Sequence, residues 1–226
     1  MLIFDATIEA LIINMRILKM QNAHIFQDSW QIDSKLSYFG ITKQELISVA
    51  IRAVTSRNDA TPFDPINAPG QLSYISGTGA IRAILIPKGD WAIDRTDNVE
   101  ATFNKKLNVK IIFQNVDHAC AKASPKAISG KGSASKRLVE NNAGFLWEEM
   151  EDEYITQVNT SVWFFCVSVN GDEIRAELSR PSAIEGKQFG EFLERIFIIT
   201  DDDYNPITDD DTNFDEQDFD IQVTRK

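Results

Sequence analysis

The feature that most restricts the fold is a predicted β-hairpin in the second half of the chain. An apolar run from Val162 to Val169 meets Asn170-Gly171, and an alternating segment from Glu173 to Arg180 follows. Asn-Gly favours a two-residue hairpin turn, because both residues tolerate positive φ. A fully apolar run is typical of a strand buried on both faces, whereas alternation is typical of a strand with one solvent face. We therefore predict a central strand and its neighbour, with these residues of the neighbour facing solvent: Glu173, Arg175 and Glu177.

Two further strand patterns lie in the same half of the chain. Apolar and polar residues alternate from Leu107 to Gln114, which indicates a strand with one buried face. The segment from Glu194 to Thr200 is rich in β-branched and aromatic residues, which are enriched in strands. Four strands are therefore expected after Trp91, where the pattern changes to period two.

Helical periodicity dominates the first half. Thr42 and Glu45 form a capping-box pattern at the start of an amphipathic segment. The same spacing of apolar residues predicts helices from Asp5 to Leu18 and from Thr78 to Ile86. The intervening segment from Arg57 to Gly70 holds three prolines, which deny backbone hydrogen bonds, so we expect a long loop there.

This order of elements predicts an α+β fold, with N-terminal helices packed on a largely antiparallel sheet. Helices followed by strands favour that class over alternating βαβ units. We expect one domain over residues 1–200, helix-rich over 1–90 and strand-rich over 91–200. Residues 201–226 carry ten acidic side chains and predict a flexible acidic tail.

Composition excludes several classes of protein. The chain has 226 residues and 43% hydrophobic residues, enough for a substantial core. Its longest apolar stretches fall far short of the ~20 residues that a membrane-spanning helix needs. No positive segment precedes the first apolar residues, so we expect neither a secretory signal nor membrane association, and we place the protein in the cytoplasm. Two cysteines, Cys120 and Cys166, are expected to be reduced.

Charge is distributed unevenly along this acidic chain of net charge −11. Between residues 103 and 139 only Asp117 is acidic, although eight residues are basic. The basic residues are Lys105, Lys106, Lys110, Lys122, Lys126, Lys131, Lys136 and Arg137. Such asymmetry concerns partners and long-range fields more than the fold. We therefore take these eight residues as candidates for binding a polyanion.

The densest part of this segment, from Lys122 to Arg137, spaces its cations with Ser, Gly and Ala. Small residues let backbone amides and hydroxyls approach a phosphate beside the charges. A phosphate-binding P-loop is excluded, because Pro125 stands where its first glycine is required and Gly132 separates Lys131 from Ser133. A solvated loop without any ligand is the alternative.

Our leading hypothesis is a non-enzymatic protein that binds nucleic acid or another polyanion through the basic segment. The acidic tail would modulate access, and a phage or host-defence context is part of the same hypothesis. The alternative is an acidic interaction module that imitates nucleic acid toward a basic partner protein. A tail that does no more than keep the protein soluble remains open as well.

A metal-dependent nuclease is a third hypothesis. Its candidate catalytic residues are Glu177, Glu185 and Lys187, because carboxylates and a lysine are the residue types that a magnesium-dependent nuclease uses to hold a cation and position water. His118 and Cys120 could ligate a transition metal, but no second pair of ligands stands at zinc spacing. We therefore predict no metal and no cofactor.

Overall fold

The computed structural model describes residues 23–140, 142 and 160–200. The helices are α2 (Ser29–Phe39), α3 (Lys43–Asn58), α4 (Ala68–Leu85) and α5 (Ser133–Glu140). The strands are β1 (His24–Phe26), β2 (Trp91–Asp94), β3 (Ala101–Asn104), β4 (Val109–Asn115), β5 (Ser161–Asn170), β6 (Glu173–Pro181), β7 (Ile184–Glu185), β8 (Gln188–Phe189) and β9 (Phe192–Ile199).

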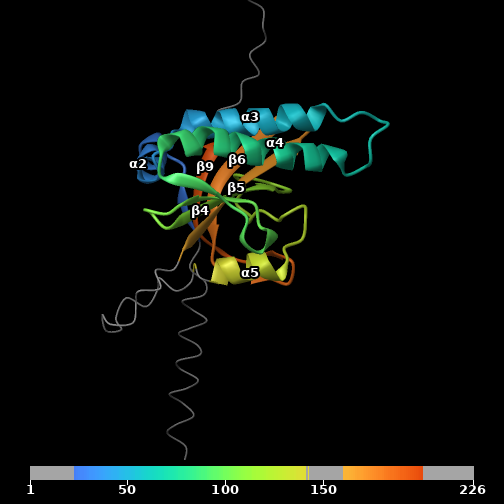
Figure 1. Ribbon diagram of the computed structural model, residues 1–226. Helices are drawn as coiled ribbons and strands as arrows, with labels where there is room; N and C mark the ends of the chain where they lie inside the picture. The colour runs from blue at the N-terminus through green and yellow to red at the C-terminus, as the bar shows by residue number, and fades with distance from the viewer. Residues whose placement is uncertain (1–22, 141, 143–159, 201–226) are drawn as a thin grey trace, which may run out of the picture.

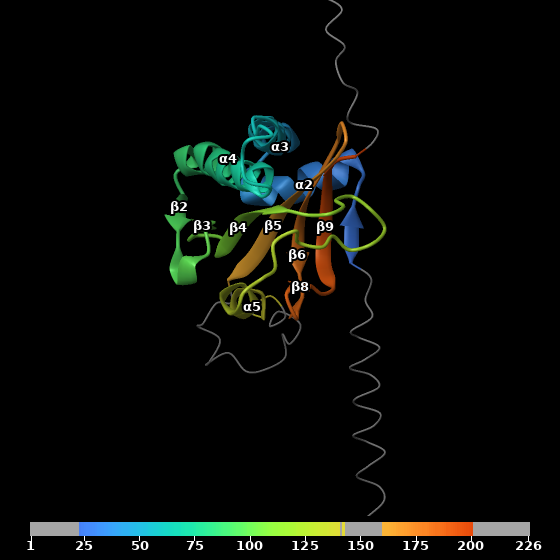
Figure 2. The same cartoon turned by 90° about the vertical axis from the view of Figure 1, so that its right-hand side faces the viewer.

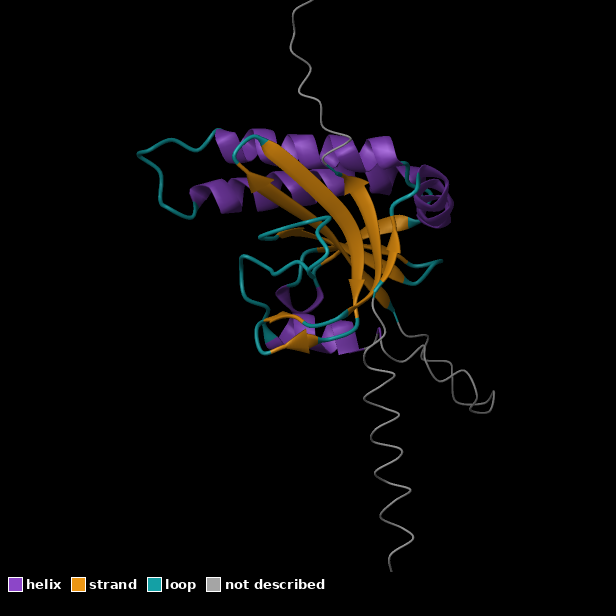
Figure 3. Cartoon of the chain, turned by 180° about the vertical axis from the view of Figure 1, so that it is seen from behind, coloured by secondary structure: helices purple, strands orange, loops and turns teal. Residues whose placement is uncertain are grey.

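Seven strands form one sheet in the order β1-β9-β6-β5-β4-β3-β2. The pairs β1 with β9 and β4 with β5 are parallel, and the other four pairs are antiparallel. Helices α2, α3 and α4 cover one face of the sheet (Figure 1, Figure 2). Helix α5, the short β7–β8 hairpin and the segment 116–132 lie against the other face (Figure 2, Figure 3). The fold therefore has a sheet between two covering layers.

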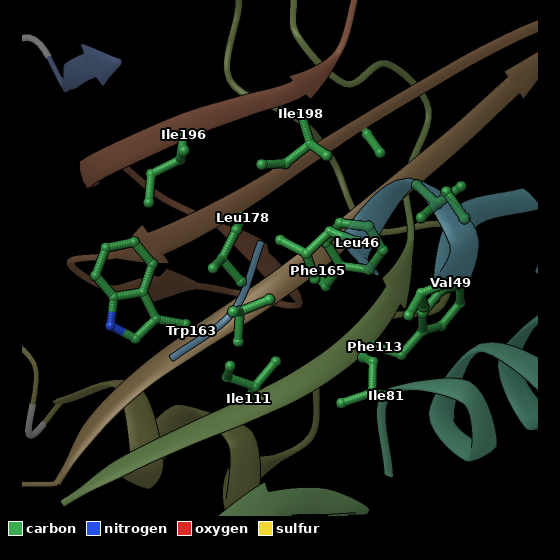
Figure 4. Close-up of a cluster of buried hydrophobic side chains, with 14 of the residues drawn as sticks. Leu46, Val49, Ile81, Ile111, Phe113, Trp163, Phe165, Leu178, Ile196 and Ile198 are labelled. Atoms are coloured by element: carbon green, nitrogen blue, oxygen red, sulfur yellow. The ribbon is translucent and has the colours of Figure 1, made fainter. Parts of the chain in front are cut away.

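Each face of the sheet has its own core. On the helical face, Leu46, Val49 and Ile81 pack against strand residues such as Phe113 and Phe165 (Figure 4). On the opposite face, a smaller cluster includes these residues of the sheet and its cover: Ile112, Phe164, Cys166, Ala119, Ala127, Val139, Ile184 and Phe189. Apolar residues fill both alternating positions of β5, which is buried on both faces, whereas β4 carries Lys110 and Gln114 beside Ile112 on its second face.

The predicted α+β class and its main elements are confirmed. β5 lies inside the sheet and pairs antiparallel with β6, and Gly171 in the turn between them has φ of 60°. At the start of α3 the Thr42 hydroxyl accepts a bond from the Glu45 amide at 3.2 Å, and the Glu45 carboxylate accepts one from the Thr42 amide at 2.8 Å. Both halves of the capping box are thus formed.

The prediction that Glu177 faces solvent is wrong. Its side chain is fully buried, because the segment 117–127 crosses this face of β6. Alternation identifies which residues share a face, but it does not show whether a distant segment covers that face. Glu173, at the start of β6, is exposed as expected.

The predicted bounds of the loop over residues 57–70 and of the helix from Thr78 to Ile86 are also wrong. α4 begins at Ala68, so the predicted loop over residues 57–70 is confined to residues 59–67, and the helix is longer than predicted. Pro69 lies in the first turn of α4, where its missing amide hydrogen is not needed. The elements that were not predicted are strands β1, β2, β3, β7 and β8 and helices α2 and α5.

Two other predictions concern the basic segment and the chain ends. Residues 133–140 form α5, so Lys136 and Arg137 lie on a helix rather than in a loop. The helix predicted from Asp5 to Leu18 and the acidic tail over 201–226 lie outside the described residues. In the described part of the chain, none of the helices combines the length and the apolarity needed to cross a bilayer.

Candidate functional site

The candidate site is a cleft beside the part of β4 that is paired with β5 on one side and with no described strand on the other. The register of β3 with β4 ends at the pair Thr102 and Ile111, and the next partner on that side is Ala127, which bridges Val116. Four residues of β4 stand between these two partners: Ile112, Phe113, Gln114 and Asn115. All four line a cleft of about 890 Å³. The cleft is therefore a gap in the pairing of the sheet.

Helix α4 forms one wall of the cleft and is fastened to β4 by a side chain. The side-chain Nδ2 of Asn115 donates to the main-chain carbonyl of Gly70 at 2.9 Å. The side-chain Oδ1 of Asn115 accepts a bond from the Ser73 hydroxyl at 2.8 Å. Because both partners of Asn115 belong to α4, this side chain sets the distance between the helix and the strand. Tyr74 and Ile75 of the same helix also line the cleft.

The main chain of Phe113 faces the gap. Peptide groups along a strand point alternately to its two sides. The main-chain amide of Val116 donates to the carbonyl of Val167 in β5 at 2.9 Å. The main-chain carbonyl of Asn115 points to the opposite side of β4 and accepts a bond from the amide of Ile128 at 3.0 Å. Phe113 is two residues from Asn115, so its N–H and C=O point toward the cleft. No described strand residue stands opposite Phe113 on that side.

Lys131 brings a positive charge to an apolar wall. Its ammonium group bonds the side-chain oxygen of Gln114, and it lies 4.9 Å from the ring centre of Phe164 and 5.2 Å from that of Phe189. Its backbone amide donates to the carbonyl of Lys187 at 2.8 Å, which fixes this segment on the β7–β8 hairpin. Burial lowers the pKa of Lys131 to about 8, because removal from water disfavours the charged form.

The remaining charges at the cleft leave it positive. The other ionised groups in its lining are Arg57 and Glu100. Glu100 accepts a bond from Arg82 at 2.5 Å and lies 3.3 Å from Arg95, and the bond from Arg82 lowers the pKa of this carboxylate. The first turn of α5 adds to the positive potential, since Gly132 and Ser135 line the cleft and helix N-termini carry partial positive charge.

The eight predicted polyanion-binding residues do not form one patch in the structure. Lys110 pairs with Asp94 at 2.5 Å and Arg137 with Asp97 at 2.8 Å. Lys131 lies in the cleft. The others are exposed and have these positions: Lys105 and Lys106 before β4, Lys122 and Lys126 after β4, and Lys136 on α5. The seven residues of β4, roughly 20 Å of strand, separate the first pair from the second.

The candidate catalytic residues are placed in different surroundings. The Glu177 carboxylate accepts bonds from Arg195 at 2.9 and 2.6 Å, from the Ser179 hydroxyl at 2.7 Å and from the Cys120 amide at 2.6 Å. All of its strong acceptor positions are engaged inside the protein. Glu185 and Lys187 lie exposed on the β7–β8 hairpin. Among the described residues no group of three or more His, Cys, Asp or Glu side chains could hold a metal ion.

His118 and Cys120 face different partners. His118 contacts the side chain of Asn170 at 3.3 Å, whereas the Cys120 thiol donates to the carbonyl of Ala176 at 3.0 Å. Burial raises the pKa of the Cys120 thiol, so the thiolate that would ligate a metal or act as a nucleophile is disfavoured.

Sequence reasoning found Lys131 but missed the other parts of the cleft. Asn115, Phe113 and the start of α4 carry no local motif, because their roles depend on which strand stops where. Gly130, beside Lys131, is a sequence signal for close packing of this segment. A Cβ added at Gly130 would lie 3.2 Å from the Cβ of Lys187. The chain matches no protein-family model, no curated protein and no solved structure.

Proposed function

We propose that this chain is a binding protein for an anionic ligand that also carries apolar groups, held in the cleft beside β4. The observation that carries the proposal is Lys131, a lysine charged at neutral pH at the apolar wall of a cleft of about 890 Å³. An ammonium group has three donors, and Gln114 takes one of them. Two donors are left to meet a ligand anion, and a large apolar cleft with a few convergent polar groups is typical of a ligand site.

The apolar lining supplies the rest of the recognition. Val99 is half-buried and Ile75 and Ile128 are exposed in the lining of the cleft, so a ligand with an apolar body would remove them from water. Charge-assisted hydrogen bonds strengthen when water is displaced, because the local dielectric falls. An anion with an apolar body therefore fits this cleft better than an inorganic anion or a neutral hydrocarbon.

The first prediction tests the role of Lys131 in ligand binding. Anilinonaphthalene sulfonate, an aromatic anion, should bind the Lys131→Met variant at least about tenfold more weakly than the parent protein, because a hydrogen bond to a charged group contributes about 1.5–3 kcal/mol. N-phenylnaphthylamine has a similar aromatic ring system without the sulfonate, and its affinity should change by less than about twofold, since apolar contacts remain. Fluorescence titration at neutral pH measures both affinities.

Two controls make this test specific. Lys136→Met removes an exposed lysine of the same basic segment and should leave both affinities unchanged. Raising the pH from about 7 to about 9.5 should weaken binding of the sulfonate to the parent protein and to Lys136→Met but not to Lys131→Met, because Lys131 loses its proton while Glu100, whose pKa is lowered by Arg82, stays ionised and Tyr74, whose pKa is raised by burial, stays neutral. Equal sulfonate affinity in the parent and Lys131→Met proteins would contradict the proposal.

A polyanion site is the second candidate, and exposed Lys122 and Lys126 favour it. They lie on a segment held in place by Asp117, whose carboxylate accepts bonds from the amides of His118 and Lys126 at 2.7 Å each. No ion pair engages either lysine within the described residues. Two exposed lysines on a segment held in place are the kind of surface that phosphates contact. The cytoplasmic location and the phage or host-defence context stay hypotheses attached to this candidate.

Salt dependence tests the second candidate. If nucleic acid contacts Lys122 and Lys126, the Lys122→Ser/Lys126→Ser variant should reduce the slope of log affinity against log salt by about 1 for each lost phosphate contact. Lys105→Ser/Lys106→Ser removes the same charge at the other end of β4 and should leave the slope unchanged. Anisotropy titrations of labelled single-stranded DNA over a range of salt concentrations measure it. A flat salt response of the parent protein would exclude the candidate.

A further inference from the structure

The unpaired stretch of β4 gives the cleft a main-chain recognition surface in addition to Lys131. The N–H and C=O of Phe113 face the cleft with no strand residue opposite. An extended peptide satisfies such groups by adding as a strand. The gap is closed at one end by Thr102, paired with Ile111, and at the other by Ile128, which bonds Asn115. An extended chain cannot run through a gap that is closed at both ends, but a chain end can enter it.

The charge at the base of the gap selects one of the two chain ends. Gln114 follows Phe113 directly and holds the ammonium group of Lys131. A main chain paired with Phe113 therefore brings its next groups close to a cation. A C-terminal carboxylate is attracted to that cation, whereas an N-terminal ammonium group is repelled by it.

The mouth of the cleft fits the residues that would precede this chain end. Ile66, Ile75 and Ile128 line the cleft and are 102%, 66% and 66% exposed. Large apolar side chains gathered in solvent around one opening are typical of an interaction surface. A polypeptide that enters the gap would cross these three residues and cover them.

We infer that the cleft captures the C-terminus of a partner polypeptide, whose terminal carboxylate binds Lys131 and whose last residues pair with the main chain of Phe113. The last side chain is apolar, since Ile112, Val99 and Phe164 surround the space that it would enter. This inference rests on the proposed function, because it names the class of anionic ligand that the cleft takes.

The test uses degenerate pools of fluorescent pentapeptides that end in Val, Leu, Ile or Phe. One pool has a free C-terminal carboxylate, a second has a C-terminal carboxamide, and a third has the free carboxylate and a methylated amide at its last residue. Fluorescence anisotropy with the parent protein, Lys131→Met and Lys136→Met gives the affinities. The parent protein and Lys136→Met should bind the free-acid pool at least about tenfold more tightly than the other two pools.

Lys131→Met should remove the preference for the acid over the carboxamide and keep the penalty for the methylated amide, because that methyl group blocks pairing with Phe113 and does not touch the charge. Equal binding of the acid and carboxamide pools to the parent protein would overturn capture of a C-terminus. Equal binding of the methylated pool would overturn pairing with β4. If the sulfonate dye binds through Lys131 but no pool binds or displaces it, the proposed function stands and this inference fails. If neither dye nor peptide binds, both fail.

Discussion

The Arg195→Ala variant should lose about 3–5 kcal/mol of unfolding free energy, the range expected when one partner of a buried ion pair is removed. Arg195 and Glu177 are 1% and 0% exposed, and two hydrogen bonds join their side chains. Without Arg195 the Glu177 carboxylate would remain buried without its counter-charge. Urea unfolding followed by circular dichroism measures the change, with the slope of the transition used to check two-state behaviour.

The same substitution should also loosen the segment 117–127. Arg195 donates to the carbonyls of Ala121 at 2.9 Å and Ala123 at 3.4 Å, and Glu177 accepts a bond from the amide of Cys120. The ion pair is therefore one of the points where this segment is attached to the sheet, beside the bond from the Ala119 amide to the Ser168 hydroxyl at 2.9 Å. Amide hydrogen exchange in the segment should rise in Arg195→Ala more than exchange in α3, which packs on the other face of the sheet.

Two further variants separate the charge effect from the loss of side-chain volume. Arg137→Ala removes an arginine from an exposed ion pair with Asp97 and should cost less than about 1 kcal/mol. The double variant Glu177→Met/Arg195→Met leaves no buried charge and should be less destabilised than Arg195→Ala, because apolar residues often replace a buried pair at little net cost. If Arg195→Ala lowered the free energy of unfolding by less than about 1 kcal/mol, the ion pair would not be important for the stability of the fold.

Local sequence patterns predicted the parts of the fold that local interactions determine. The capping box needs only Thr42 and Glu45, and the hairpin needs a glycine-containing turn between two strand-forming runs, although the two turn residues are Gly171 and Asp172 rather than the predicted Asn170 and Gly171. These signals act within a few residues, so the sequence alone carries them. Glu177 shows the limit, since its strand, β6, was predicted and its face was not. Whether that face meets solvent depends on residues 117–127, about fifty positions earlier in the chain.

The candidate site was less accessible to sequence reasoning for the same physical reason. The cleft exists because the pairing of β4 with β3 stops at Ile111 and the next partner of β4 on that side is Ala127, opposite Val116. Both pairings join segments that are separate in the sequence. The basic segment includes Lys131, which lines the cleft. It gave a false impression of a single patch, because Lys110 and Arg137 are paired with Asp94 and Asp97 of a segment that precedes it in the sequence.

Two glycines of α4, two positions apart, should respond to alanine in opposite directions. A Cβ added at Gly77 would lie 2.3 Å from a ring carbon of Phe113, whereas one added at Gly79 would meet nothing within 4 Å. Gly79→Ala should therefore stabilise the protein by about 0.5–1 kcal/mol, the usual gain from replacing glycine inside a helix. Gly77→Ala gains the same propensity but must displace a buried ring, so we expect a net loss of about 1–2 kcal/mol after overpacking is included.

The pair of glycine variants also connects stability with the cleft. Phe113 packs against Phe165 with ring centres 6.3 Å apart, so turning its ring away from α4 would disturb this edge-to-face contact. In Gly77→Ala the helix must move away from β4, and this motion strains the contacts of Asn115 with Gly70 and Ser73. We expect weaker binding of the sulfonate dye by Gly77→Ala and unchanged binding by Gly79→Ala. Thermal unfolding and dye titration of both variants measure these effects, and equal behaviour of the two would show that the close approach of α4 to β4 does not shape the cleft.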